Sequence, residues 1–164
     1  LVPISVNFSK NTLIYPKLME YIKELCNTFG MPEGMIRVEI TETISNMDHI
    51  EVKNIARTLC DMGFSMSMDD FGTQYSNMQV LTQFDFDTVK IDRSMILNIV
   101  NDQKNRTLLK YTVAMLKELG MGIVIEGVET AEQVEVLAEL GCDIVQGFFF
   151  GRPEPEEQFY DLFM

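Results

Sequence analysis

The stretch SerMetSerMetAspAspPheGlyThr, residues 65–73, decides the fold. Ser65, Ser67 and Asp69 alternate with two methionines, and a period of two between polar and apolar side chains is typical of a β-strand with two different faces. Two adjacent carboxylates then stand at the end of this run, Asp69 and Asp70. Strand packing alone would not select two charges there, so the sequence predicts a strand with functional side chains at its carboxyl end.

Five further segments also end in a polar or charged residue. Helical patterns follow most of them, and strands that alternate with helices over short joints predict a parallel sheet with right-handed crossovers. In β/α barrels the reactive groups lie where the strands run into the loops at one face. The sequence therefore predicts an α/β fold of the TIM-like (β/α) barrel class. The segments are IleSerValAsn (4–7), IleArgValGlu (36–39), ThrValLysIleAsp (88–92), GlyIleValIleGlu (122–126) and AspIleValGln (143–146).

The barrel is expected to be incomplete. The chain has 164 residues and about six βα units, whereas a closed TIM barrel has eight. Either the first two strands are missing at the N-terminus or the sheet stays open. No polar linker divides the units, so we interpret residues 1–164 as a single domain. The chain begins with LeuValProIleSerVal and no initiator Met, which we interpret as a cut edge.

Helices are predicted between the strands from apolar stripes and from residues that start and stop helices. Pro16 is expected in the first turn of one helix, with Gly30 at its end. The sequence ThrAlaGluGln, residues 130–133, is a capping box. The expected helices cover residues 15–29, 48–63, a short segment after 75, 102–119, 130–141 and 156 to the end.

Composition excludes several classes of function. The formal net charge is −12, which argues against non-specific binding of DNA, RNA or an anionic membrane. No apolar run of 18 or more residues exists. The three cysteines form no CxxC pair, so reduced thiols and a cytoplasmic location are expected. His49 is the only histidine, which excludes His-rich zinc sites and a Ser/His or Cys/His nucleophile.

Polar residues converge at the predicted barrel mouth. On each strand examined, the residue of interest shares the polar face, and that face is expected to point into the barrel. Four carboxylates crowded together repel one another unless cations neutralise them. Their hard oxygen ligands suit Mg²⁺ or Mn²⁺ better than zinc. Any one of them alone could be a simple turn residue. The converging set is Asn7, Glu39, Asp69, Asp70, Lys90, Glu126 and Gln146.

Lys90 stands within a strand between Val89 and Ile91. A charge in that place is costly unless it is paired. An ion pair with a neighbouring carboxylate is one interpretation. A Schiff-base lysine of a barrel aldolase is another.

Six motifs together carry a family resemblance. They are ValAsnPheSer (6–9), GluIleThrGlu (39–42), AspAspPheGlyThr (69–73) followed by TyrSer (75–76), ValLysIleAspArgSer (89–94), GluGlyValGluThr (126–130) and GlyCysAspIleValGlnGly (141–147) with ArgPro (152–153). In these motifs the chain resembles the EAL domain, the cyclic di-GMP-specific phosphodiesterase module of bacterial signalling proteins. The resemblance spans essentially the whole chain and corresponds to the C-terminal two-thirds of the full barrel. It implies metal-dependent hydrolysis of cyclic di-GMP to linear pGpG.

The resemblance also implies roles for individual residues. Asn7, Glu39 and Asp69 would hold one Mg²⁺ or Mn²⁺, while Asp69 and Asp70 would serve a second. Lys90 and Glu126 would act with Asp70 in catalysis, because Lys90 orients the attacking water and Glu126 accepts a proton or positions the water. The remaining residues would bind substrate or support the site: Glu42 bracing the AspAspPheGly loop, Asp92 holding Lys90, Glu129, Gln146, and Arg152 with Phe148 to Phe150. For Glu42 and Glu129, local capping is the alternative, and for the three aromatic residues it is core packing.

Two departures from the family pattern set further expectations. The Glu-Ala-Leu tripeptide is absent together with the first two strands, and Gln74 replaces the second glycine of the AspPheGlyThrGly loop. We therefore expect this fragment to be inactive by itself.

A homodimer is expected, through residues 71–84 or through the truncated edge. The parent protein is expected to carry sensory or GGDEF-type domains and could be anchored in a membrane. The alternative function is a non-catalytic module for cyclic di-GMP binding or dimerisation.

Overall fold

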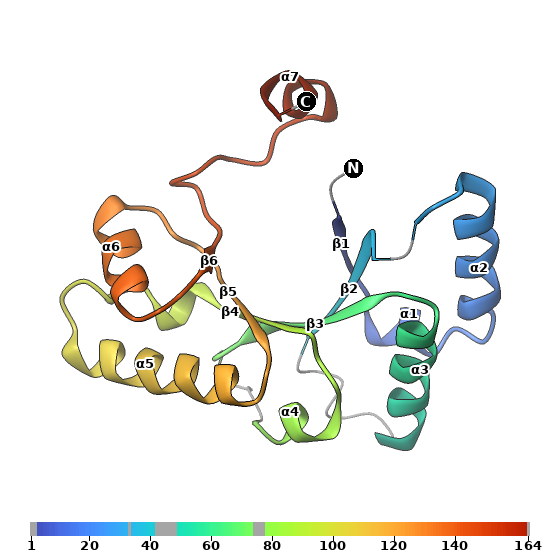
Figure 1. Ribbon diagram of the computed structural model, residues 1–164, viewed down its shortest axis with the longest axis horizontal. Coiled ribbons are helices and arrows are strands. Elements are labelled where there is room, and N and C mark those ends of the chain that lie inside the picture. The colour runs from blue at the N-terminus through green and yellow to red at the C-terminus, as the bar shows by residue number, and fades with distance from the viewer. Residues whose placement is uncertain (1–2, 33, 42–48, 74–77, 164) are drawn as a thin grey trace.

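Six parallel strands form one curved sheet in the computed structural model, which describes residues 3–32, 34–41, 49–73 and 78–163 (Figure 1). The strands follow one another in chain order across the sheet, as the sequence predicts for successive βα units. They are β1 (Ile4–Asn7), β2 (Ile36–Thr41), β3 (Ser65–Phe71), β4 (Thr88–Ile91), β5 (Gly122–Ile125) and β6 (Ile144–Val145).

Helices cover the convex side of the sheet, and the concave side faces the opening of a half-barrel (Figure 1). The six predicted helices are present with small shifts in their bounds. One additional turn, α1, was not predicted because it has only four residues, and the Ser9 side chain caps it by accepting from the Thr12 N–H. The helices are α1 (Lys10–Leu13), α2 (Leu18–Phe29), α3 (His49–Asp61), α4 (Gln79–Gln83), α5 (Gln103–Glu118), α6 (Ala131–Glu139) and α7 (Glu156–Phe163), with the short 3₁₀ helix η2 (Arg93–Met95) after β4.

The two faces of the sheet differ as the alternation predicts. Met66 and Met68 are almost completely buried on the face covered by helices. Ser67 and Asp69 alternate with them and are also buried, but on the concave face. The apolar face supplies the hydrophobic free energy of the fold. The concave face therefore holds polar groups that need partners of their own.

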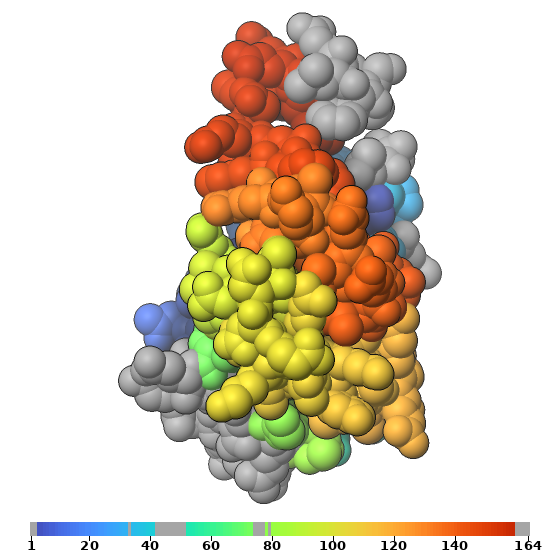
Figure 2. Space-filling view, turned by 90° about the vertical axis from the view of Figure 1, so that its left-hand side faces the viewer, coloured from blue at the N-terminus to red at the C-terminus, as the bar shows by residue number. Residues whose placement is uncertain are grey.

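The sheet is not closed by the described residues. β1 and β6 are its two edges, and all four residues of β1 are exposed. The side chain of Ile4 is 64% exposed and that of Ile144 on β6 is 56% exposed. The C-terminal helix α7 stands off the body above the opening (Figures 1 and 2). The expected incomplete barrel is thus confirmed. Among the described helices, none combines the length and the apolar character that a bilayer crossing requires.

Candidate active site

Parallel pairing brings the predicted polar residues to one end of the sheet. Asn7 pairs with Glu39 across β1 and β2, and Thr41 pairs with Asp69 across β2 and β3. Glu126 follows β5 directly, and its N–H donates to the carbonyl of Ile91 at 2.9 Å. These contacts align the carboxyl ends of adjacent strands, where β/α barrels carry their chemistry.

The Lys90 ammonium is the centre of this end of the sheet. Its Nζ lies 2.9 Å from Glu39 Oε2, 3.1 Å from Asp69 Oδ1 and 2.8 Å from Glu126 Oε1. The Lys90 side chain is only 12% exposed. The four side chains come from four adjacent strands or strand ends, so a single cation links the whole width of the site. The ion-pair interpretation of Lys90 is therefore the one that the geometry supports.

The surroundings shift two pKa values. Burial alone would lower the pKa of Lys90, but the hydrogen bonds that its ammonium donates to three carboxylates outweigh burial and raise the pKa above its ordinary value. Burial raises the pKa of Glu126, the Lys90 ammonium opposes this, and the charges of Asp69 and Glu39 add to the rise. Lys90 is thus a permanent cation. Glu126 is the carboxylate of the site that takes up a proton more readily than a free glutamate.

A local irregularity in β3 gives the site its second aspartate. Strict alternation would turn Asp69 and Asp70 to opposite faces. However, the register between β3 and β4 shifts between Met68 and Phe71, and Asp70 has a φ of +58°. A left-handed backbone at a residue other than glycine is strained and is typical of functional sites. The bulge turns the Asp70 carboxylate toward the same side as that of Asp69.

As a result, three carboxylates could share a cation. One ligand oxygen from each of Asp69, Asp70 and Glu126 lies within 4.8 Å of the other two. Hard oxygen donors of this kind suit Mg²⁺, Mn²⁺ or Ca²⁺. Glu126 was among the four crowded carboxylates expected to need a cation, but the family resemblance gave it a catalytic role and named Asn7, Glu39, Asp69 and Asp70 as the metal ligands. The place of Asp70 beside Asp69 and Glu126 depends on the bulge, which the alternation pattern does not show.

The two outer strands carry the remaining polar residues of the predicted set. Asn7 is exposed at the end of β1, next to Glu39 in the pairing. Gln146 is exposed directly after β6, where its N–H donates to the carbonyl of Ile125 at 2.8 Å and its carbonyl accepts from the N–H of Val128. Both residues lie at the carboxyl end of the sheet, on either side of the carboxylates around Lys90.

The supporting residues are placed differently from expectation in one case. Asp92 forms no ion pair with Lys90 among the described residues, because its carboxylate accepts from the Ser94 N–H at 2.9 Å and caps η2. Glu129 forms an ion pair with Arg93, with Oε1 and Nη1 3.0 Å apart. Glu42 and Gln74 lie outside the described residues, so their predicted roles remain predictions.

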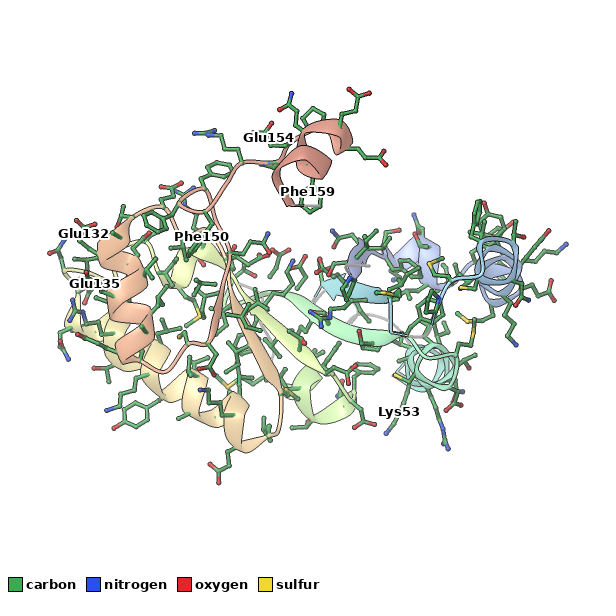
Figure 3. All side chains as sticks on the ribbon, turned by 45° about the horizontal axis from the view of Figure 1, so that its top comes forward. Lys53, Glu132, Glu135, Phe150, Glu154 and Phe159 are labelled. Carbon is green, nitrogen blue, oxygen red and sulfur yellow. The ribbon has the colours of Figure 1, made fainter. Side chains whose placement is uncertain are left out.

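The C-terminal segment presents an exposed cation and aromatic rings. The guanidinium of Arg152 lies 4.5 Å from the centre of the Phe148 ring. Phe148, Phe149 and Phe150 are each about half exposed, so the core interpretation of this aromatic run is wrong for these residues. Figure 3 shows Phe150 on this segment and Phe159 on α7. An exposed aromatic and cationic surface suits a planar or phosphate-bearing ligand.

A pH experiment on the metal-free protein checks the electrostatics. A carboxyl group whose pKa is raised by folding contributes stability below its unfolded pKa, and this stability is lost as the pH rises through the folded pKa. Glu126→Gln keeps the neutral form at every pH. We expect this variant to be more stable than the wild type at about pH 7 in EDTA, with the difference shrinking as the pH falls toward the ordinary value of 4.5.

Urea unfolding at several pH values measures this effect. Glu135→Gln is the matched control, because Glu135 projects from the outer side of α6 (Figure 3) and is exposed. A Glu126→Gln variant that is less stable than the wild type by the same amount at every pH would contradict the assignment.

Comparison with known proteins identifies the family. The family model described as the EAL domain matches residues 1–153. The chain belongs to the EAL domain family. An EAL relative, the cyclic di-GMP phosphodiesterase RocR of Pseudomonas aeruginosa, is 35% identical over 161 residues, which are 98% of this chain and 41% of RocR.

Solved EAL structures share the fold. The EAL domain of Mycobacterium smegmatis DcpA has a TM-score of 0.92 at 29% identity and covers 98% of this chain, which corresponds to 72% of that structure. The structure of Klebsiella pneumoniae BlrP1 in complex with manganese and cyclic di-GMP has a TM-score of 0.85 at 27% identity, covering 92% of this chain and 39% of that one. The chain spans between 20% and 41% of the length of the first curated relatives it matches.

Proposed function

We propose that this chain carries the catalytic face of a cyclic di-GMP phosphodiesterase. One observation carries the proposal. Lys90 bonds three carboxylates at the carboxyl ends of adjacent strands, and Asp70 joins two of them within 4.8 Å. The reaction is the attack of water on one phosphorus atom of the cyclic dinucleotide. One phosphorus–oxygen ester bond breaks, the leaving ribose oxygen takes up a proton, and the product is linear pGpG.

The proposed cofactor is Mg²⁺ or Mn²⁺ in a site of two metals. Asp69, Asp70 and Glu126 would supply its clustered carboxylate oxygens, and Asn7 and Glu39, at the neighbouring strand ends, would join Asp69 at one of the two metals. When bound, the metals would neutralise charge on the phosphate and lower the pKa of the attacking water. The chemistry of the donor set supports this choice, because all these groups offer oxygen.

The other side chains of the site are proposed to have separate roles in catalysis and in substrate binding. Lys90 is proposed to orient the attacking water and to balance the negative charge that develops at the phosphate, because its ammonium lies among the carboxylates of the site. Glu126, whose carboxylate contacts the Lys90 ammonium at 2.8 Å, is proposed to position the attacking water or to accept its proton. Gln146, directly after β6, and Arg152, on the segment that follows it, are proposed to contact the dinucleotide. Glu129 is proposed to support the site through its ion pair with Arg93.

Hydrolysis assayed by chromatography tests the proposal. A chain extended to the full barrel of the solved EAL domains should convert cyclic di-GMP to pGpG in the presence of Mn²⁺. The present chain should be slower by about 100-fold or more, because the edges at β1 and β6 leave the site open to water. Efficient turnover by residues 1–164 would show that a closed barrel is unnecessary. Binding without turnover by the extended chain would favour the non-catalytic module.

The proposed assembly is a homodimer within a longer, multidomain signalling protein. Residues 71–84, as far as they are described, include the exposed side chain of Met78, and the unpaired edge at β1 is a second surface for association. Light scattering should give twice the monomer mass at high protein concentration. A strictly monomeric species would contradict both surfaces. The three free cysteines agree with a cytoplasmic location for this domain, with sensory or GGDEF-type domains elsewhere in the protein.

A further inference from the structure

The short turn after β4 lies between two loops of the candidate site. Asp92 begins the turn, and its N–H donates to the carbonyl of Phe71 at 2.9 Å, directly after the two aspartates of β3. On the other side, the N–H of Glu126 donates to the carbonyl of Ile91. The 3₁₀ helix η2 therefore continues a strand that separates Asp69 and Asp70 from Glu126.

Two glycines allow this turn to press against both loops. A Cβ atom added to Gly127 would lie 2.5 Å from both Cβ and Cγ of Arg93, and one added to Gly72 would lie 2.6 Å from Cγ of Met95. No real Cβ atom tolerates such distances. The side-chain stem of Arg93 thus fills the space over the residue that follows Glu126. Met95 fills the space over the residue next but one to Asp70.

Further contacts hold the loop after β5 to the same turn. Arg93 Nη1 lies 3.0 Å from Glu129 Oε1, and in Figure 2 the yellow-green residues after β4 lie against the orange residues after β5. The two side chains are 49% and 40% exposed. An ion pair with that exposure contributes little. The packing of the Arg93 stem on Gly127 is therefore the stronger constraint.

We propose that Arg93 is a positioning residue, whose stem sets the separation between Glu126 and the aspartate pair of β3. The inference rests on the metal site of the proposed function, since that separation decides whether the three carboxylates can share a cation. Metal ligands depend on the groups that hold them, and loss of such support typically weakens metal binding by about 10–100-fold.

Mn²⁺ binding to the chain, measured by calorimetry, tests the proposal with a matched pair of variants. Gly127 and Gly120 have almost the same φ, +73° and +77°, but an added Cβ at Gly120 meets nothing within 4 Å. Both alanine variants therefore place a Cβ atom on a residue with a similar positive φ. We expect Gly127→Ala to weaken Mn²⁺ binding by about tenfold and Gly120→Ala to leave it unchanged. In the double variant Gly127→Ala/Arg93→Ala the collision is absent, so its Mn²⁺ affinity should be no weaker than that of Gly127→Ala, whereas two independent losses would add.

A second pair separates the stem from its charge and does not depend on whether Gly127→Ala folds. Arg93→Met keeps most of the stem and removes the charge, whereas Arg93→Ala removes both. We expect Mn²⁺ affinity to fall about tenfold in Arg93→Ala and to stay within about twofold of the wild type in Arg93→Met. Equal affinities for these two variants would overturn the role of the stem, as would equal affinities for Gly127→Ala and Gly120→Ala. A wild-type chain that bound no Mn²⁺ would instead overturn the proposed metal site itself.

Discussion

Replacing Lys90 with methionine is expected to lower the turnover of cyclic di-GMP by about 10²–10³-fold in a chain that completes the barrel. The ammonium lies within 3.1 Å of three carboxylate oxygens, so it is fixed before substrate arrives. A fixed charge needs no reorganisation as negative charge develops at the phosphate. Methionine has a similar length and no charge, so the variant removes the electrostatic contribution while it fills most of the space.

Substrate affinity should change much less than turnover, because Lys90 is assigned to the water and the developing charge. Affinity is measured with Ca²⁺ in place of Mn²⁺ to slow hydrolysis. Lys117→Met is the matched control, since Lys117 also pairs with a carboxylate, that of Asp143 at 2.9 Å, but on the exposed helical side. If Lys90→Met kept near wild-type turnover and lost substrate affinity, Lys90 would be a ligand anchor and the proposed mechanism would be wrong.

Asp69→Asn should reduce the affinity for Mn²⁺ by about 100-fold or more, at the upper end of the effects known for residues that merely support a metal ligand. Asp69 belongs both to the carboxylates around Lys90 and to the three clustered carboxylates. Its carboxylate contacts Lys90 and the N–H of Asp70, each at 3.1 Å, and offers one of the three clustered oxygens. Calorimetry compares this variant with Asp143→Asn, which removes an exposed carboxylate outside the site. Equal Mn²⁺ affinities for Asp69→Asn and the wild type would remove Asp69 from the metal site.

The sheet and much of the site could be predicted from the sequence, because the alternation of polar and apolar residues shows both where the strands lie and which side chains share the concave face. In SerMetSerMetAsp, residues 65–69, the alternation assigns the methionines to the helix-covered face and Asp69 to the concave face, as found. Lys90 could be placed in the same way, since a charge between two apolar residues has to find partners. Parallel pairing then brings Glu39, Asp69 and Glu126 around it without further information.

The features that the sequence did not reveal depend on breaks in that periodicity. Alternation alone turns Asp70 toward the helices, and only the bulge with its φ of +58° returns it to the site. The bulge thereby brings an Asp70 oxygen within 4.8 Å of oxygens of Asp69 and Glu126. Asp92 lies on the face that the alternation along β4 assigns to it. However, it is one residue beyond the strand, where its carboxylate accepts from the Ser94 N–H and, in the part of the chain that the structure describes, forms no ion pair with Lys90. Capping of a turn that short leaves no periodic signal.

The proposed function requires these strand ends to bind metal and to add water to cyclic di-GMP. Mass spectrometry of the product formed in ¹⁸O-labelled water tests it most directly, with a chain that completes the barrel and with Mn²⁺ or EDTA present. We expect pGpG that carries one ¹⁸O atom in its terminal phosphate, formed with Mn²⁺ and not with EDTA. Metal-dependent hydrolysis at this site would be contradicted by any of three results. The product could be unlabelled, it could form equally well in EDTA, or no product could form although the chain binds cyclic di-GMP and Mn²⁺ tightly.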